Sequence, residues 1–307
     1  MNEQYYEHHN GLAHDLEVMA HRALERRRML GFFVSGGAAL VLGGCGGAGG
    51  ESGSDDTSAS SSDSTAGSTN SGTATTDTSS TSGASGSTCI VDPTETEGPY
   101  PGDGSNRVNG SLVNVLAQSG VVRSDIRSSF GSLSGTAEGL PMTLKIAVVN
   151  VNNNCAPLTG YAVYLWHCTR GGEYSLYSSS IQNQNYLRGV QVTDSNGQCA
   201  FVSIFPGCYD GRWPHIHFEL YQSANTAMSY SNKLLTSQMA MPMDISRAVY
   251  AAVSGYSASV SNLARISLAS DNVFSDNTSE QIAWQTPTFT GDTTNGYTAT
   301  ITIGIAV

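Results

Sequence analysis

The sequence predicts an all-β domain over residues 89–307: a β-sandwich of mostly antiparallel strands with one short helix. Short runs that are apolar, or that alternate apolar with polar side chains, recur at close intervals, and Gly, Pro, Asn and Asp separate them. Helical periodicity is clear only in residues 243–256. Short strands with almost no helix are typical of a sandwich or a barrel.

We expect seven strands in this domain. They cover residues 142–151, 160–168, 199–205, 215–221, 236–241, 286–290 and 296–307. The last strand follows the dipeptide Asn295-Gly296, which is typical of a tight hairpin turn. The region is long enough to bury one substantial hydrophobic core.

Residues 1–45 have the layout of a bacterial export signal. An arginine cluster precedes an apolar run that is short for a membrane-spanning helix and that ends in small residues and Cys45. The tetrapeptide LGGC resembles a lipobox, and RRRML resembles the twin-arginine export motif, although adjacent arginines also suit general secretion. We therefore expect cleavage before Cys45, lipidation of Cys45, and a protein held by acyl chains at the periplasmic or cell-surface side of the envelope.

Residues 46–88 are expected to form a disordered, mildly acidic tether. They contain no aromatic residue, and alanine supplies their only aliphatic side chains. Such a segment buries too little apolar surface to offset the entropy of an ordered chain.

The charge balance argues against nucleic-acid binding, and the cysteine spacing argues against one disulfide. From Ile90 onward, ten Lys and Arg face fifteen Asp and Glu, and no basic cluster remains, which disfavours nucleic-acid binding. Five cysteines follow Cys45, so at least one is expected to be unpaired or intermolecular. If the chain between Cys199 and Cys208 is extended, their separation of roughly 25–30 Å forbids a disulfide.

Histidine is scarce in the folded region, where it occurs only as His167, His215 and His217. His215 and His217 lie two positions apart on an expected strand, so their side chains point to the same face and can bind one metal ion. Alone, this pattern also fits two histidines on a polar sheet face. Tyr209 and Arg212 lie on the preceding loop; a tyrosine can supply an anionic oxygen to a strongly acidic cation, and an arginine can stabilise negative charge.

The motifs around these residues resemble those of the intradiol ring-cleavage dioxygenases, the family of catechol, protocatechuate and hydroxyquinol dioxygenases and their secreted relatives. The matching blocks occur in the family's order at residues 96–101 (TEGPYP), 155–175, 186–220 and 236–242. The block 186–217 is highly specific. The region after Pro242 matches only loosely, and the family's helical dimerisation segment has no counterpart, so the oligomeric state does not carry over.

The resemblance implies one non-haem Fe(III) held by Tyr174, Tyr209, His215 and His217. Tyr174 and His215 would be equatorial ligands, and Tyr209 and His217 axial ones. Tyr209 would also act as a catalytic base, and Arg212 would stabilise charge on the substrate.

The implied reaction inserts both atoms of O2 into a catechol-type aromatic molecule and gives a muconate-type diacid. The resemblance also points to Tyr100 and Gln238 as substrate contacts, and it favours a Cys89–Cys155 disulfide among several possible pairings. The partners are then the catechol and O2, with no nucleic acid, and a membrane only through the lipid anchor. The competing hypothesis is a non-catalytic envelope lipoprotein that binds aromatics or carbohydrate on the same fold.

Overall fold

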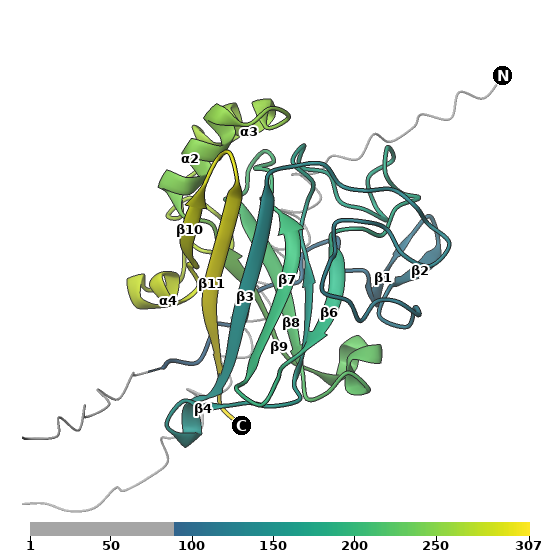
Figure 1. The fold of residues 1–307 in the computed structure, drawn as a ribbon, viewed down its shortest axis with the longest axis vertical. Coiled ribbons are helices and arrows are strands. Elements are labelled where there is room, and N and C mark those ends of the chain that lie inside the picture. The colour runs from purple at the N-terminus through teal and green to yellow at the C-terminus, as the bar shows by residue number, and fades with distance from the viewer. Residues whose placement is uncertain (1–88) are drawn as a thin grey trace, which may run out of the picture. The chain divides into compact units, whose positions relative to one another are not determined.

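The computed structural model describes residues 89–307 (Figure 1). The export signal, the lipidation site Cys45 and the tether of residues 46–88 lie outside the described residues and stay predictions. Within residues 89–307, no helix is long and apolar enough to cross a membrane.

The first of the two large sheets has five strands and is built around β3 (Pro141–Asn150). β3 pairs with β11 (Gly296–Ile305) in parallel and with β7 (Gln198–Ile204) and the short β4 (Ala156–Pro157) in antiparallel orientation. β10 (Thr288–Asp292) forms an antiparallel hairpin with β11, as the Asn-Gly dipeptide predicts. Burial along β3 alternates at every second residue of its first eight, because one face of the sheet packs on the core.

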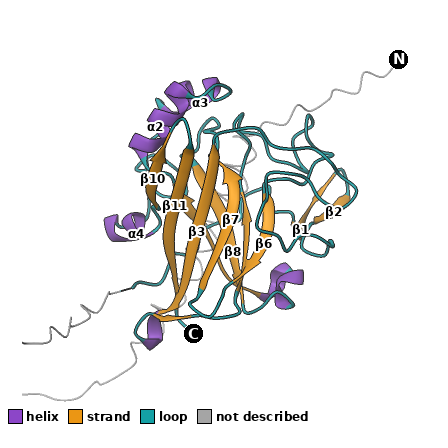
Figure 2. Cartoon of the chain, in the orientation of Figure 1, coloured by secondary structure: helices purple, strands orange, loops and turns teal. Residues whose placement is uncertain are grey.

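The second large sheet has the order β6-β5-β8-β9, and all of its pairs are antiparallel. Its strands are β5 (Ala162–Trp166), β6 (Arg188–Val192), β8 (His215–Tyr221) and β9 (Lys233–Ala240). Figure 2 shows β8 of this sheet behind the strands of the first sheet. The cross-strand register places Trp166 opposite His217, and His217 opposite Gln238, so the three side chains follow one another across one face.

One hydrophobic core joins the two sheets. It contains Leu144 and Ile146 of β3, Ile216 and Phe218 of β8, and Ile303 of β11. β8 is nevertheless buried at every residue, on both faces. A second apolar cluster, which includes Tyr164, Trp166, Tyr174, Tyr177 and Tyr221, covers the opposite face of this sheet. The histidines of β8 therefore lie in a covered interior and not on a polar surface.

The prediction of mostly antiparallel strands with few helices is confirmed, and the helix predicted in residues 243–256 is present, but it is not the only α-helix of the described residues. The described residues form three α-helices: α2 (Met243–Ala252), α3 (Ser257–Leu263) and α4 (Ser279–Trp284). The segment 243–256 ends its helix at Ala252, and α3 is a short, serine-rich helix with little apolar periodicity. α4 carries a capping box between Thr278 and Gln281, a signal that the sequence does contain.

Several short elements escaped the sequence-based prediction. β1 (Asp103–Val108) and β2 (Ser111–Asn114) form a separate hairpin, whose turn residues Asn109 and Gly110 both have positive φ. The single-turn helices are η1 (Val151–Asn153), η2 (Thr226–Met228) and η3 (Tyr230–Asn232).

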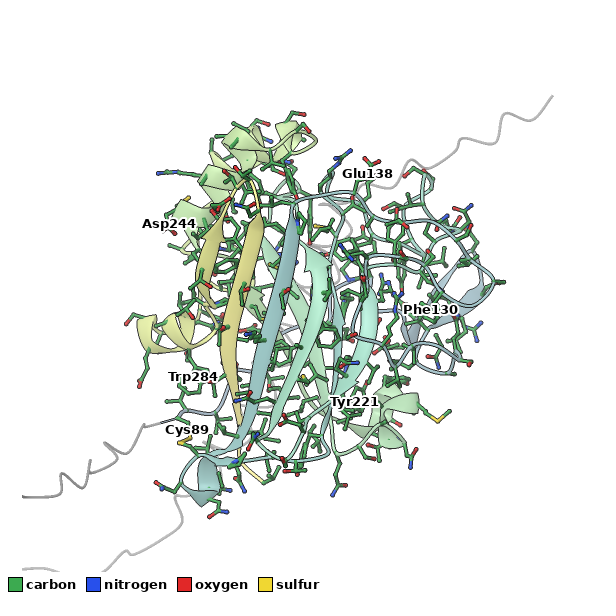
Figure 3. All side chains as sticks on the ribbon, viewed as in Figure 1. Cys89, Phe130, Glu138, Tyr221, Asp244 and Trp284 are labelled. Carbon is green, nitrogen blue, oxygen red and sulfur yellow. A yellow bond between two sulfur atoms is a disulfide. The ribbon has the colours of Figure 1, made fainter. Side chains whose placement is uncertain are left out.

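The favoured disulfide is present: Cys89 and Cys155 are bonded, with Cα atoms 5.9 Å apart. Cys168, Cys199 and Cys208 are free, in agreement with the exclusion of a Cys199–Cys208 bond. The bond closes a 66-residue separation and anchors the start of the described chain, on the flank where Figure 3 labels Cys89 and Trp284.

Candidate metal centre

Two imidazoles and two phenols converge at the N-terminal end of β8. The Nε2 atoms of His215 and His217 are 3.1 Å apart, as expected for side chains two positions apart on one strand. The hydroxyl of Tyr174 lies 3.3 Å from Nε2 of His215, and that of Tyr209 lies 3.4 Å from the same nitrogen. The structure therefore brings together all four side chains that the sequence singled out as candidate ligands.

The tyrosines reach this point on two loops that pack closely because each contains a glycine at the contact. Gly172 has φ of +90°, and a Cβ there would lie 2.9 Å from Cβ of Tyr209. A Cβ at Gly207 would lie 2.7 Å from the carbonyl oxygen of Arg170. Any other residue at these two positions would push apart the loops that carry Tyr174 and Tyr209.

Contacts from neighbouring residues fix the orientation of both histidine rings. Nδ1 of His215 lies 2.5 Å from the carbonyl oxygen of Trp213, so Nδ1 carries the proton and Nε2 is left as the acceptor. The ring of His217 stacks on that of Trp166, with centroids 4.8 Å apart and planes 7° apart. Nδ1 of His217 is buried and has no hydrogen-bond partner among the described residues.

Burial sets the protonation states of the centre. Burial and then the charge of Arg212 lower the pKa of His215 to about 3, and burial and then His215 hold the pKa of His217 well below its ordinary value. Both imidazoles are therefore neutral, which is the form that binds metals. Burial and then Tyr209 raise the pKa of Tyr174 well above its ordinary value. Only a strongly acidic cation would release this proton.

The donor set fits a single small cation. Atoms that each lie about 2.0–2.1 Å from one ion, the usual distance for an imidazole nitrogen, are themselves about 2.8–4 Å apart. The three separations in the structure, 3.1, 3.3 and 3.4 Å, lie within that range. Residues 89–307 contain no group of three or more His, Cys, Asp and Glu that could hold a metal. A site here depends on the phenol oxygens, which favours a hard, strongly acidic metal such as Fe(III).

Arg212 is buried beside this centre and is held by two partners. Its Nε donates to Oδ2 of Asp271 (2.9 Å), and its Nη2 donates to Oε1 of Gln238 (2.7 Å). Its Nη1 is buried and has no hydrogen-bond partner among the described residues. The guanidinium thus retains one donor nitrogen for a ligand.

A segment near the start of the domain covers the centre. We call residues 92–102 the N-terminal segment. Gly98 lies against His217, because a Cβ there would be 3.4 Å from Cε1 of that ring. Tyr100 packs on Tyr174, with ring centroids 4.8 Å apart, so it lies beside the candidate centre. Gln238 is the other expected contact, and both polar atoms of its amide bind protein groups. Its Nε2 donates to the carbonyl oxygen of Thr96, and its Oε1 accepts from Arg212.

Other candidate residues have structural partners. Nε2 of His167 lies 2.7 Å from Oγ of Ser203, so this histidine has a hydrogen-bond partner outside the four converging residues. Tyr177 donates to Asn106 and accepts from the backbone of Gly102. It thus supports the N-terminal segment and is not one of the converging phenols.

The sequence-based prediction missed Asp271 and Trp166. Asp271 follows Pro242, in the region where the family motifs fade, and 59 positions separate it from Arg212. Nothing local marks it as a partner. Trp166 is part of an ordinary apolar strand, and only the cross-strand register places it against His217.

Comparison with known proteins adds an independent observation. A sequence model of a family described as "Dioxygenase" matches residues 126–224, which include all four converging residues and Arg212. The chlorocatechol 1,2-dioxygenase of Rhodococcus opacus is 39% identical over 54 residues, which are 18% of this chain and 21% of that protein. The match thus spans about a fifth of this relative's length.

Solved structures show the same fold. An intradiol ring-cleavage dioxygenase from Tetranychus urticae superposes with a TM-score of 0.52 and 20% identity, over 71% of this chain and 95% of that chain. A second dioxygenase structure gives a TM-score of 0.54 and 22% identity over the same shares. The resemblance to the intradiol ring-cleavage dioxygenases is confirmed. Their fold accounts for the convergence of residues that are far apart in the sequence.

Proposed function

We propose that this domain is a non-haem Fe(III) intradiol dioxygenase that inserts both atoms of O2 into a catechol-type aromatic molecule and yields a muconate-type diacid. Tyr174, Tyr209, His215 and His217 would hold the iron. The observation that carries the proposal is the convergence of two phenols and two neutral imidazoles, with separations of 3.1 to 3.4 Å between their polar atoms, inside the segment that matches the dioxygenase family. When bound, ferric iron supplies Lewis acidity toward a catecholate.

The two tyrosines differ in a way that suits different roles. Tyr174 is buried and packed between Tyr100 and the histidines, whereas Tyr209 is only half-buried. We assign to Tyr174 the permanent ligand role. We assign to Tyr209, a loop residue, the role of base: it would be held as a phenolate when the metal is bound and would take up one proton from the incoming catechol, becoming a neutral phenol.

Arg212 would stabilise negative charge that develops on the substrate. Its Nη1 is the one donor nitrogen with no protein partner among the described residues, and it is buried, so a charge placed near it is poorly screened by water. Tyr100 would form one wall of the substrate space, and Gln238 would act through Arg212 and the N-terminal segment.

The setting of the domain is part of the proposal. The two sheets with their common core support a β-sandwich. Export, lipidation of Cys45 and an envelope location rest on the sequence of residues 1–45. The competing function is that of an envelope protein that binds aromatics without turnover. The test below distinguishes it from the proposed function.

The test is O2 uptake with product identification. The iron-loaded protein would be assayed with catechol, protocatechuate, hydroxyquinol and larger lignin-derived catechols. Stoichiometric O2 consumption and a ring-opened diacid from at least one of these would support the proposal. A protein that binds iron and shifts its visible spectrum with catechols, yet consumes no O2 with any of them, would favour the binding function.

A further inference from the structure

Asp271 lies in the connection between α3 and α4, far along the chain from the candidate centre. Its carboxylate is fully buried and accepts hydrogen bonds at both oxygens. Oδ1 accepts from the backbone N–H groups of Val273 (2.8 Å) and Phe274 (3.1 Å). Oδ2 accepts from the backbone N–H of Trp213 (2.7 Å) and from Nε of Arg212 (2.9 Å). The carboxylate is therefore held rigidly by its own turn while it holds Arg212.

The guanidinium plane of Arg212 is fixed at two of its three nitrogens. Asp271 binds Nε, and Gln238, on the neighbouring strand β9, binds Nη2. Because a guanidinium is planar, fixing two nitrogens also fixes the direction of the third. That third nitrogen, Nη1, is buried and has no hydrogen-bond partner in residues 89–307. The arrangement prepares one donor for a ligand.

Charge gives Asp271 a second effect. Arg212 binds Gln238, which lies opposite His217 in the β8–β9 register, so its buried charge is next to the two histidines of β8. An arginine without a counter-ion at this place would repel a cation bound by those histidines, and the low dielectric of the interior would strengthen the repulsion. The ion pair with Asp271 offsets this charge, so the arginine and a metal ion can share one buried site.

We propose that Asp271 is a positioning residue of the candidate centre: it orients Arg212 so that Nη1 faces the ligand space, and its charge allows a cation to bind beside that arginine. This inference rests on the proposed function. The competing explanation is purely structural, since Oδ1 also closes the turn of residues 271–274.

A double-mutant cycle separates the two explanations. The variants are Asp271→Asn, Arg212→Met and the double variant, with Asp271→Glu as a form that keeps the charge and moves it. The matched control is Asp125→Asn, which removes a carboxylate from the exposed ion pair with Arg127. For each purified protein, near-ultraviolet circular dichroism checks the fold. Ferric iron affinity is measured by competition with a chelator, and kcat and KM are measured with the best catechol.

We expect Asp271→Asn to lower iron affinity and kcat by about 10- to 100-fold each, the usual effect of losing a group that supports metal ligands. Arg212→Met should lower kcat without lowering iron affinity. The double variant should match Arg212→Met in kcat within about twofold and should regain iron affinity, because Asp271 acts through Arg212. Asp271→Glu should retain iron affinity and lose kcat, whereas Asp125→Asn should match the wild type.

Additive losses in the double variant, or an Asp271→Asn protein with unchanged iron affinity and unchanged kcat, would overturn the inference. If Asp271→Asn does not fold, Asp271→Glu decides: wild-type kcat in that variant would contradict the positioning role. A wild-type protein that binds no ferric iron would overturn the proposed function and this inference together. If the wild type binds ferric iron and turns over a catechol, and the Asp271 variants do so equally well, this inference alone is overturned.

Discussion

The segment that matches the dioxygenase family and the two regions that flank it contribute differently to the candidate centre. Residues 126–224 supply the four converging side chains and Arg212. The flanks supply the groups that cover and orient them: Gly98 and Tyr100 before the segment, Gln238 and Asp271 after it. The candidate ligands and Arg212 thus come from the one segment that carries the family motifs. Their orientation depends on contacts from distant parts of the chain.

Removing one candidate ligand oxygen should have the largest effect. Tyr174→Phe keeps the buried ring and its packing on Tyr100 but deletes the hydroxyl beside His215. We expect iron affinity and O2 uptake to fall by more than about 100-fold, beyond the effect of losing a supporting group. The measurements are a chelator titration and an oxygen electrode. The control is Tyr186→Phe, a buried tyrosine elsewhere in the same segment; equal losses in both variants would contradict the assignment.

Breaking the disulfide should affect stability more than chemistry. Cys89–Cys155 anchors the start of the N-terminal segment and closes a long loop in the unfolded chain. Replacing both cysteines with serine should lower the free energy of unfolding by about 2–5 kcal/mol, measured by urea denaturation. Iron affinity at low temperature should stay within a few-fold of wild type. Cys199→Ser, at a free cysteine, is the control; an iron affinity lost together with the disulfide would show that the flank also holds the metal.

Asp92 should make the stability of the N-terminal segment depend on pH. Burial raises the pKa of Asp92 to about 7, although its Oδ2 accepts from Trp284 and from the backbone of Gly304. Because the folded state holds this proton more tightly than the unfolded state, stability is greatest below about pH 4 for this group and falls as the pH rises toward 7.

Asp92→Asn has a similar shape without the charge, and its one side-chain oxygen can still accept the hydrogen bonds from Trp284 and Gly304. It should remove this decline, so that the variant is less sensitive than wild type to pH between about 4 and 7. Urea denaturation at several pH values is the measurement. An Asp92→Asn protein with the same pH dependence as the wild type would contradict the role of Asp92.

Tyr100 should give the smallest effect, and it should appear in KM. Tyr100→Ala removes the ring that packs on Tyr174. Loss of the Tyr100 ring should weaken catechol binding by about 3- to 10-fold, the range of one aromatic contact. Tyr100→Phe should remain close to wild type if the ring, and not the hydroxyl, forms the wall. Steady-state kinetics with one catechol would decide. An unchanged KM in Tyr100→Ala would remove Tyr100 from the substrate space.

The sequence predicted elements whose pattern is local. β8 was predicted with the bounds that the structure shows, because its apolar run is enclosed by turn residues and its histidines alternate with core residues. The β1–β2 hairpin and α4 are not among the predicted elements, although Asn109-Gly110 and the Thr278–Gln281 capping box are local signals for them.

Other features were out of reach of any local pattern. Glu95 of the N-terminal segment accepts from Asn277, 182 positions away, and Asp271 accepts from Arg212 across 59 positions. Such pairs depend on how the sheets and connections pack, and neither residue stands in a motif. The candidate ligands could be predicted because their motifs are short. The groups that orient them could not.

Titration of the purified apo-protein with ferric iron, followed by visible absorption, tests the central claim most directly. If Tyr174 and Tyr209 share one iron with His215 and His217, a tyrosinate-to-iron charge-transfer band will colour the protein red to purple. The band will saturate at one equivalent and shift when a catechol is added. A protein that takes up one equivalent of ferric iron and stays colourless would contradict the account.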